Sequence, residues 1–233
     1  MRHSKCFSTA MNPSLSVPAE ALSVTVPANE VNLAADVTLP ADARGLVIFA
    51  HGSGSSRHSR RNRFVAQILN EAGLGTMLID LLTEQEEIVD DQTAQLRFDI
   101  PFLGRRLVAI TDWVVQQRTF AKLTTGYFGA STGAAAALLG AAARPAIVKA
   151  VVSRGGRPDL AGEALGRVIA PTLFIVGGED STVLELNRAA MKQLPRGTKR
   201  QLEVIPGATH LFEEPGTLLQ AAMLARAWFQ DHL

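Results

Sequence analysis

The stretch Gly129-Ala130-Ser131-Thr132-Gly133 lies between two segments of different character. Residues 125–130 form a short apolar run, which predicts a buried strand, and residues 132–143 are rich in alanine, which predicts a helix. A serine between such elements sits on a very tight turn, where side chains two positions away would collide with their neighbours. Glycines at both positions remove those side chains. In this setting G-x-S-x-G is typical of a turn that lifts a serine hydroxyl above a sheet, and the alternative is an ordinary Gly-Ser turn.

Similar apolar runs recur along the chain and alternate with helical patterns. Predicted buried strands cover residues 45–50, 74–81, 147–152, 172–176 and, more weakly, 202–205, and predicted helices cover residues 60–72, 103–117, 183–194 and 217–233. Residues 22–26 and 31–39 alternate apolar and polar side chains, which predicts an edge hairpin. This alternation of strand and helix predicts an α/β fold, with a mostly parallel sheet that carries helices on both faces.

The composition excludes several classes of protein. The chain has 233 residues, of which 47% are apolar and 19% are charged, so it can bury a core and is not a disordered chain. The formal net charge of +1 gives no electrostatic case for nucleic acid or an anionic membrane as the main partner. We expect a single domain over residues 21–233, preceded by an irregular tail over residues 1–20.

Cysteine usage and the apolar segments give an expected location. Cys6 is the only cysteine, so neither an intramolecular disulfide nor a cysteine-based metal site is expected. Residues 1–10 lack the apolar core of a secretory signal, and we expect a cytoplasmic protein. Residues 123–143 carry no charge and are long enough to span a bilayer, but the glycine-containing turn inside them argues against a membrane helix.

A serine hydroxyl needs a base to become a nucleophile, and the chain has five histidines. In a mostly parallel sheet, ligands bind beyond the carboxyl ends of the strands, so residues that follow predicted strands are the candidates. His210 follows the last predicted strand and is the best candidate base. His51 and His58 follow the first buried strand, whereas His3 lies in the tail and His232 is one residue from the end. The alternative for His210 is a surface histidine without such a role.

The base in turn needs an acid that fixes its tautomer and stabilises the imidazolium. Asp180 follows the predicted strand at residues 172–176 and precedes a predicted helix, which makes it the candidate acid. The same position suits a helix N-cap, and that is the alternative interpretation of Asp180. The neighbouring Glu179 is a rival acid whose side chain starts one residue earlier.

The loop after the first buried strand has the sequence His51-Gly52-Ser53-Gly54-Ser55-Ser56. A glycine-rich loop at this place can present a backbone N–H group to a developing oxyanion. We expect the donor to be Ser53, with Gly54 as the alternative, and the second donor to be Thr132, which follows the candidate nucleophile. The loop lacks the Gly-Lys-Ser/Thr ending of a phosphate-binding loop, and the chain has no dinucleotide-binding fingerprint.

Together these residues resemble the α/β-hydrolase fold, in which nucleophile, acid and base follow one another in the order seen here. More narrowly, the chain is similar to the small, lidless branch that is like dienelactone hydrolase. The resemblance rests on four runs, which are residues 51–59 (HGSGSSRHS), 80–83 (DLLT), 153–158 (SRGGRP) and 206–212 (PGATHLF). It implies an eight-stranded, mostly parallel sheet with a minimal cap or none, and a triad of Ser131, Asp180 and His210.

One residue departs from the pattern of that branch. Dienelactone hydrolases use a cysteine nucleophile, whereas this chain has Ser131 at that position. The resemblance therefore implies the fold but does not extend to dienelactone as the substrate. Some relatives in the branch are hydrolases fused or related to phosphoribosyltransferases, but a second domain does not fit within 233 residues.

Two further segments are expected to shape the substrate pocket. Residues 83–97 begin with an acidic run and are expected to form a solvated loop or a short helix, with a partial flap over the site as the alternative. Arg154 and Arg157 follow the predicted strand at residues 147–152. They either clamp a carboxylate or phosphate of the substrate, or hold their own loop through Asp159.

Basic residues also crowd the start of the helix predicted at residues 60–72. Arg57 and three arginines that follow it would oppose the helix dipole there, which hints at an anion site. Arg57 is therefore a further candidate substrate contact, and His51, which directly follows the first buried strand, is another.

The sequence thus predicts a serine hydrolase that cleaves a carboxylic ester, or a related acyl bond, of a small and possibly anionic molecule through an acyl-enzyme on Ser131. The alternatives are an acyltransferase with the same triad and a non-catalytic binding or accessory protein with this fold. No cofactor, metal, nucleic acid or membrane partner is expected, and the sequence does not indicate an oligomeric state.

Overall fold

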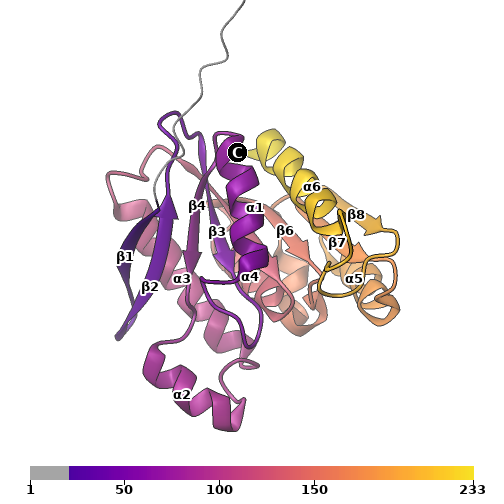
Figure 1. Cartoon of the computed structure of the whole chain (residues 1–233), viewed down its shortest axis with the longest axis horizontal. Helices are drawn as coiled ribbons and strands as arrows, with labels where there is room; N and C mark the ends of the chain where they lie inside the picture. Colours follow the sequence, from indigo (N-terminus) through magenta and orange to yellow (C-terminus); the bar gives the residue numbers. More distant parts are fainter. Residues whose placement is uncertain (1–20) are drawn as a thin grey trace, which may run out of the picture.

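One eight-stranded sheet forms the centre of the structure, a computed structural model that describes residues 21–233 (Figure 1). The tail expected over residues 1–20 lies outside the described residues. In chain order the strands are β1 Leu22–Ala28, β2 Val31–Thr38, β3 Gly45–Ala50, β4 Gly75–Ile79, β5 Thr124–Ala130, β6 Val148–Arg154, β7 Thr172–Gly177 and β8 Arg200–Ile205. Their order across the sheet is β1-β2-β4-β3-β5-β6-β7-β8.

The sheet is parallel except at one edge. β1 pairs antiparallel with β2, and β2 pairs antiparallel with β4, whereas every pair from β4 to β8 is parallel. The edge hairpin and the mostly parallel, eight-stranded sheet predicted from the sequence are therefore confirmed. The carboxyl ends of the parallel strands meet at one rim, which is the lower rim in Figure 1.

Helices cover both faces of this sheet, as the alternation of patterns predicts. The helices are α1 Arg60–Glu71, α2 Glu84–Thr93, α3 Ile100–Gln116, α4 Thr132–Ala143, α5 Ser181–Gln193 and α6 Thr217–His232. α1 and α6 pack on the face that carries Phe49 and Phe128, while α3, α4 and α5 pack on the face that carries Ile48 and Tyr127. α4 is buried along most of its length, because its alanines let the helix approach the sheet closely.

Two elements differ from the sequence prediction. α3 begins at Ile100, three residues before the predicted Leu103, because Asp99 caps it by accepting from the Phe102 amide at 2.9 Å. A 3₁₀ helix over Pro158–Arg167 has no counterpart in the prediction. It is interrupted at Gly162, which has φ of 53°, so its sequence has no continuous helical period.

Residues 83–97 contain the short helix that was one of the expected outcomes. The Thr83 side chain accepts from the Glu86 amide and the Glu86 carboxylate accepts from the Thr83 amide, which forms a capping box at the start of α2. α2 projects beyond the lower rim of the sheet in Figure 1, so it stands beside the end where ligands bind.

Residues 123–143 divide between β5 and α4, as the turn between them predicts. None of the helices in the described part of the chain has the length and apolar character that crossing a bilayer requires.

Candidate active site

The turn between β5 and α4 places Ser131 in a strained conformation. Its φ is 52° and its ψ is −123°, values that a residue with a side chain rarely adopts. A Cβ atom on Gly129 would lie 2.4 Å from Cα of Ala134, and one on Gly133 would lie 2.2 Å from the carbonyl oxygen of Ala50. The expected reason for both glycines is therefore confirmed, since neither position has room for a side chain.

Backbone hydrogen bonds from the next strand hold this turn. The Ser131 amide donates to the carbonyl oxygen of Arg154 at 3.2 Å, and the Arg157 amide donates to the carbonyl oxygen of Ser131 at 3.1 Å. Ser131 is the N-cap residue of α4, but its side chain makes no capping hydrogen bond. The hydroxyl is consequently free to face the rim of the sheet.

The structure brings the three residues of the expected triad together. Oγ of Ser131 lies 3.3 Å from Nε2 of His210, and Nδ1 of His210 donates to Oδ2 of Asp180 at 2.6 Å. Asp180 follows β7 and His210 follows β8, so neighbouring parallel strands deliver both side chains to the same rim. Glu179, the rival acid, is exposed and makes no side-chain hydrogen bond within residues 21–233.

The loop after β3 passes beside the serine. A Cβ atom on Gly52 would lie 3.0 Å from Cβ of Ser131, which shows how closely the loop approaches. The Ser53 amide donates to Oγ1 of Thr132 at 2.9 Å. Thr132 is the first residue of α4, and its own amide has no acceptor within the helix. One of the two amides expected to bind an oxyanion, that of Ser53, therefore contacts the residue that carries the other, next to Ser131.

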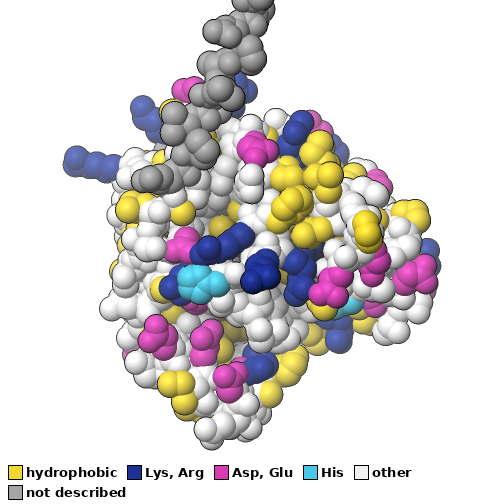
Figure 2. All heavy atoms as spheres, viewed as in Figure 1, with side chains coloured by type: hydrophobic (Ala, Val, Ile, Leu, Met, Phe, Trp, Pro, Cys, Tyr) yellow, Lys and Arg dark blue, Asp and Glu magenta, His cyan; other side chains and the backbone are white. Residues whose placement is uncertain are grey.

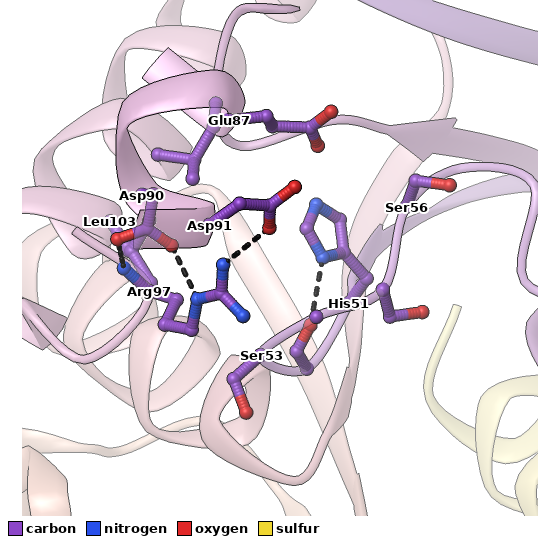
Figure 3. A pocket seen from close by; sticks show the side chains of 12 residues that line it. His51, Ser53, Ser56, Glu87, Asp90, Asp91, Arg97 and Leu103 are labelled. Atoms are coloured by element: carbon purple, nitrogen blue, oxygen red, sulfur yellow. Dashed lines mark hydrogen bonds and ion pairs between the residues drawn. The ribbon is translucent and has the colours of Figure 1, made fainter. Parts of the chain in front are cut away.

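His51 lines the cavity beside the candidate site, and both of its ring nitrogens contact backbone groups (Figure 3). Nδ1 of His51 lies 3.0 Å from the carbonyl oxygen of Gly52, and Nε2 accepts from the Leu81 amide at 3.0 Å. This pattern fixes the neutral tautomer with the proton on Nδ1. Because both ring nitrogens are engaged with backbone, the imidazole could contact a substrate only through its ring carbons, and the role of His51 as a substrate contact stays a prediction.

We expect His51 to make the protein less stable in mild acid. Burial lowers the pKa of His51 below its ordinary value of 6.5, although the Gly52 carbonyl and Asp80 oppose this shift. As the pH falls below 6.5, the unfolded chain takes up a proton at this residue before the folded protein does, so the free energy of unfolding decreases by up to about 1.4 kcal/mol per pH unit. The decrease ends at the lower pKa of the folded state.

Urea unfolding between pH 7 and 5 tests this, with His51→Gln as the variant and the exposed His58→Gln as the matched control. His51→Gln should reduce the dependence of the unfolding free energy on pH, while His58→Gln should leave it unchanged. An equal dependence in wild type and His51→Gln would contradict the assignment.

Two of the candidate arginines also have internal partners. Both the backbone amide and the guanidinium of Arg57 bind the Asp80 carboxylate at the end of β4. The Arg157 guanidinium donates to both carboxylate oxygens of Asp159, at 2.9 and 2.7 Å, which raises the pKa of Arg157. Arg157 thus holds its own loop, which was the structural alternative. Arg154 has no such pair in the part of the chain that the structure describes.

A cavity of about 260 Å³ opens between the loop after β3 and the segment that carries α2 (Figure 3). Its lining includes Gly52 and Ser53 on one side and Glu87 and Arg97 on the other. The Arg97 guanidinium is bound by the Asp90 and Asp91 carboxylates. This guanidinium reaches the loop after β3, since a Cβ atom on Gly54 would lie 3.7 Å from its Nη1 (Figure 3). Residues 83–97, for which a partial flap was the alternative to a loop or short helix, therefore form a side wall of this cavity.

An ion pair fixes this wall to the rest of the fold. The Arg106 guanidinium of α3 donates to the Glu86 carboxylate and to the carbonyl oxygen of Leu81. Although burial alone would raise it, these hydrogen bonds and those from Thr83 hold the pKa of Glu86 below its ordinary value. The capping-box pattern Thr83-x-x-Glu86 is a sequence signal for this wall, but nothing in the sequence pairs Arg106 with Glu86.

Comparison with known proteins agrees with this architecture. The profile of the dienelactone hydrolase family matches residues 33–230. The chain belongs to the dienelactone hydrolase family. The crystal structure of a dienelactone hydrolase from Anabaena variabilis is 53% identical, covers 93% of this chain and 100% of its own, and superposes with a TM-score of 0.91. The resemblance expected from the sequence is thus confirmed, and family and fold together indicate a hydrolase.

Other relatives carry different names. Two proteins from strains of Mycobacterium tuberculosis with the provisional name phosphoribosyl transferase are 58% identical over 210 residues. The alignment covers 90% of this chain but 46% of theirs, so the chain spans about half the length of these curated relatives. An α/β serine hydrolase without a lid from Xanthomonas campestris is 21% identical with a TM-score of 0.70, covering 92% of this chain and 96% of its own, and supports the fold alone.

Proposed function

We propose that this protein hydrolyses carboxylic esters of small molecules through an acyl-enzyme on Ser131. The observation that carries the proposal is the continuous line of contacts from Oγ of Ser131 to Nε2 of His210, and from Nδ1 of His210 to the Asp180 carboxylate. A hydroxyl, an imidazole and a carboxylate in this order are the parts that acyl transfer needs. Membership of a hydrolase family supports the same chemistry.

Each residue has a defined part in the proposed reaction. His210 takes the Ser131 proton while Oγ attacks the ester carbonyl carbon, and Asp180 stabilises the imidazolium that forms. The amides of Ser53 and Thr132 bind the oxyanion of the tetrahedral intermediate. His210 then protonates the leaving alcohol, and a water molecule, activated by the same imidazole, releases the acid and restores Ser131.

A panel of 4-nitrophenyl esters of increasing acyl length tests this function. We expect turnover with burst release of nitrophenol, because acylation precedes a slower hydrolysis of the acyl-enzyme. Adding glycerol as an acceptor separates two enzymes, since an acyltransferase forms glycerol ester and a hydrolase forms the free acid. No turnover of any ester, together with no labelling by a fluorophosphonate, would favour the accessory protein and contradict the proposal.

We expect Asp180→Asn to reduce kcat by about 10⁴-fold, because the amide cannot hold the His210 tautomer or stabilise the imidazolium. Glu179→Gln removes a carboxylate one residue earlier that does not contact His210, so it should keep near-normal kcat and serves as the matched control. Steady-state kinetics with one ester at pH 7 measures both. The reverse result, a large loss only in Glu179→Gln, would assign the acid to Glu179.

A further inference from the structure

Arg154 is a buried cation that has no carboxylate partner among residues 21–233. It is the last residue of β6, and only 7% of its surface is exposed. Its guanidinium carbon lies 5.9 Å from the ring centre of Phe128 and 5.7 Å from that of Phe212. Within residues 21–233, Nη2 donates to Oδ1 of Asn62 at 3.4 Å and Nη1 has no hydrogen-bond partner.

Such an arrangement is unfavourable unless an anion completes it. A buried charge is costly when neither a counter-ion nor a full set of hydrogen bonds compensates it. Burial, and secondarily the nearby Arg61, lower the pKa of Arg154 to about 10, which leaves the group charged at neutral pH. The two aromatic faces and one amide oxygen do not supply the negative charge that a guanidinium fork binds best.

The surroundings of Arg154 also favour a negative ligand. Asn62 and Arg61 belong to the first turn of α1, where the helix dipole is positive and no acidic side chain is present. Arg61 pairs with Glu213 at 3.2 Å, but the Glu213 side chain is 66% exposed and that of Arg61 is 35% exposed, so solvent weakens this pair. In Figure 2 a row of Lys or Arg side chains crosses the middle of the face over the start of α1.

This cluster lies directly beside the candidate active site. The carbonyl oxygen of Arg154 accepts from the Ser131 amide at 3.2 Å. Phe212, which packs over the Arg154 guanidinium, follows His210 by two residues and has a φ of 57°. The Arg154 backbone thus holds the Ser131 turn, and its guanidinium lies against the loop that carries His210.

We propose that Arg154, Arg61 and Asn62 form a binding site for an oxyanion, either a carboxylate or a phosphate, next to Ser131. Arg154 supplies two N–H donors of its buried guanidinium. Asn62 donates from its side-chain NH₂ group while its Oδ1 still accepts from Arg154. Arg61 breaks its ion pair with Glu213 and binds the oxyanion from the solvent side. Where the oxyanion is one end of the substrate, which rests on the proposed function, the site selects esters that carry an acidic group.

Titration with sodium phosphate tests binding directly. At constant ionic strength, balanced with sodium chloride, the Tm of the wild type should rise to a plateau as phosphate is added, since a ligand that binds only the folded state stabilises it. Arg154→Met fills the space between the two rings without a charge and should abolish this rise. Arg154→Lys, which keeps the charge without the fork, should retain part of it.

The matched control is Arg60→Met, which removes an exposed arginine from the same helix turn and should keep the full rise. Circular dichroism verifies that each variant is folded. The proposal would be overturned if phosphate raised the Tm of the wild type no more than chloride does. It would also be overturned if folded Arg154→Met showed the full phosphate-dependent rise in Tm.

Paired esters identify the source of the oxyanion. If the substrate carries it, the wild type should prefer 4-nitrophenyl hemiglutarate over 4-nitrophenyl butyrate by at least tenfold in kcat/KM, and Arg154→Met should lose that preference while Arg60→Met keeps it. Equal kcat/KM for the two esters, with the phosphate-dependent rise in Tm intact, would assign the site to a free anion. If neither ester is cleaved, the proposed function fails, and the phosphate titration still decides whether the site exists.

Discussion

Ser131→Ala is expected to abolish ester hydrolysis, with a loss in kcat of roughly 10⁶-fold, as found when a serine nucleophile that acts as one unit with its base is removed. The hydroxyl 3.3 Å from Nε2 of His210 is the group that would form the acyl-enzyme. Alanine lacks that oxygen, so the variant cannot form the acyl-enzyme at position 131. Steady-state turnover of 4-nitrophenyl esters and labelling with a fluorophosphonate measure the two losses independently.

Ser153→Ala is the matched control for this experiment. Ser153 lies in β6, beside the strand that leads to Ser131, and its hydroxyl is buried without a partner in the described part of the chain. The control should keep both turnover and labelling. Continued labelling of folded Ser131→Ala would show that another residue is the nucleophile.

Gly133→Ala is expected to destabilise the protein by roughly 3 kcal/mol or more and to remove fluorophosphonate labelling. The added Cβ would lie 2.2 Å from the carbonyl oxygen of Ala50 and 2.4 Å from that of His51. These carbonyls cannot withdraw easily, because β3 is held by parallel pairing with β4 on one side and β5 on the other. The strained turn must move instead, and Ser131 moves with it.

Gly197→Ala provides the control, since a Cβ atom there meets nothing within 4 Å and the backbone is not left-handed. Its unfolding free energy in urea should stay within about 0.5 kcal/mol of the wild type. An unchanged urea midpoint for Gly133→Ala, with full labelling, would show that the turn has more room than the structure indicates.

Much of the fold follows from local patterns that need no tertiary information. Strands buried on both faces are apolar at every position, so β3 and β7 stand out as continuous runs between polar segments. The meeting of Ser131, Asp180 and His210 is predictable as well, because residues after the strands of one parallel sheet lie at one rim. The choice between Asp180 and Glu179 needed coordinates, since a shift of one residue turns the side chain in another direction.

The sequence alone could not decide the different roles of Arg154 and Arg157. Arg154 and Arg157 belong to one short run and follow the same strand, yet only Arg157 finds a carboxylate, two residues away. Arg154 still belongs to β6, and the alternation of side chains along the strand directs it toward α1. Asn62, which receives it, is 92 residues distant in the chain, and no local pattern links the two.

The contact between the Ser53 amide and the Thr132 hydroxyl has a consequence for selectivity in the proposed reaction. The Thr132 hydroxyl accepts a hydrogen bond from this amide, much as a bound water would. The carbonyl oxygen of a neutral ester is no stronger an acceptor than the Thr132 hydroxyl oxygen that it would replace. The negative oxygen that develops during attack is a stronger acceptor than that hydroxyl. The Ser53 amide therefore exchanges the Thr132 hydroxyl for the substrate oxygen favourably only when negative charge forms on that oxygen. Through this competition, Thr132 makes the loop bind the transition state more strongly than the ground state.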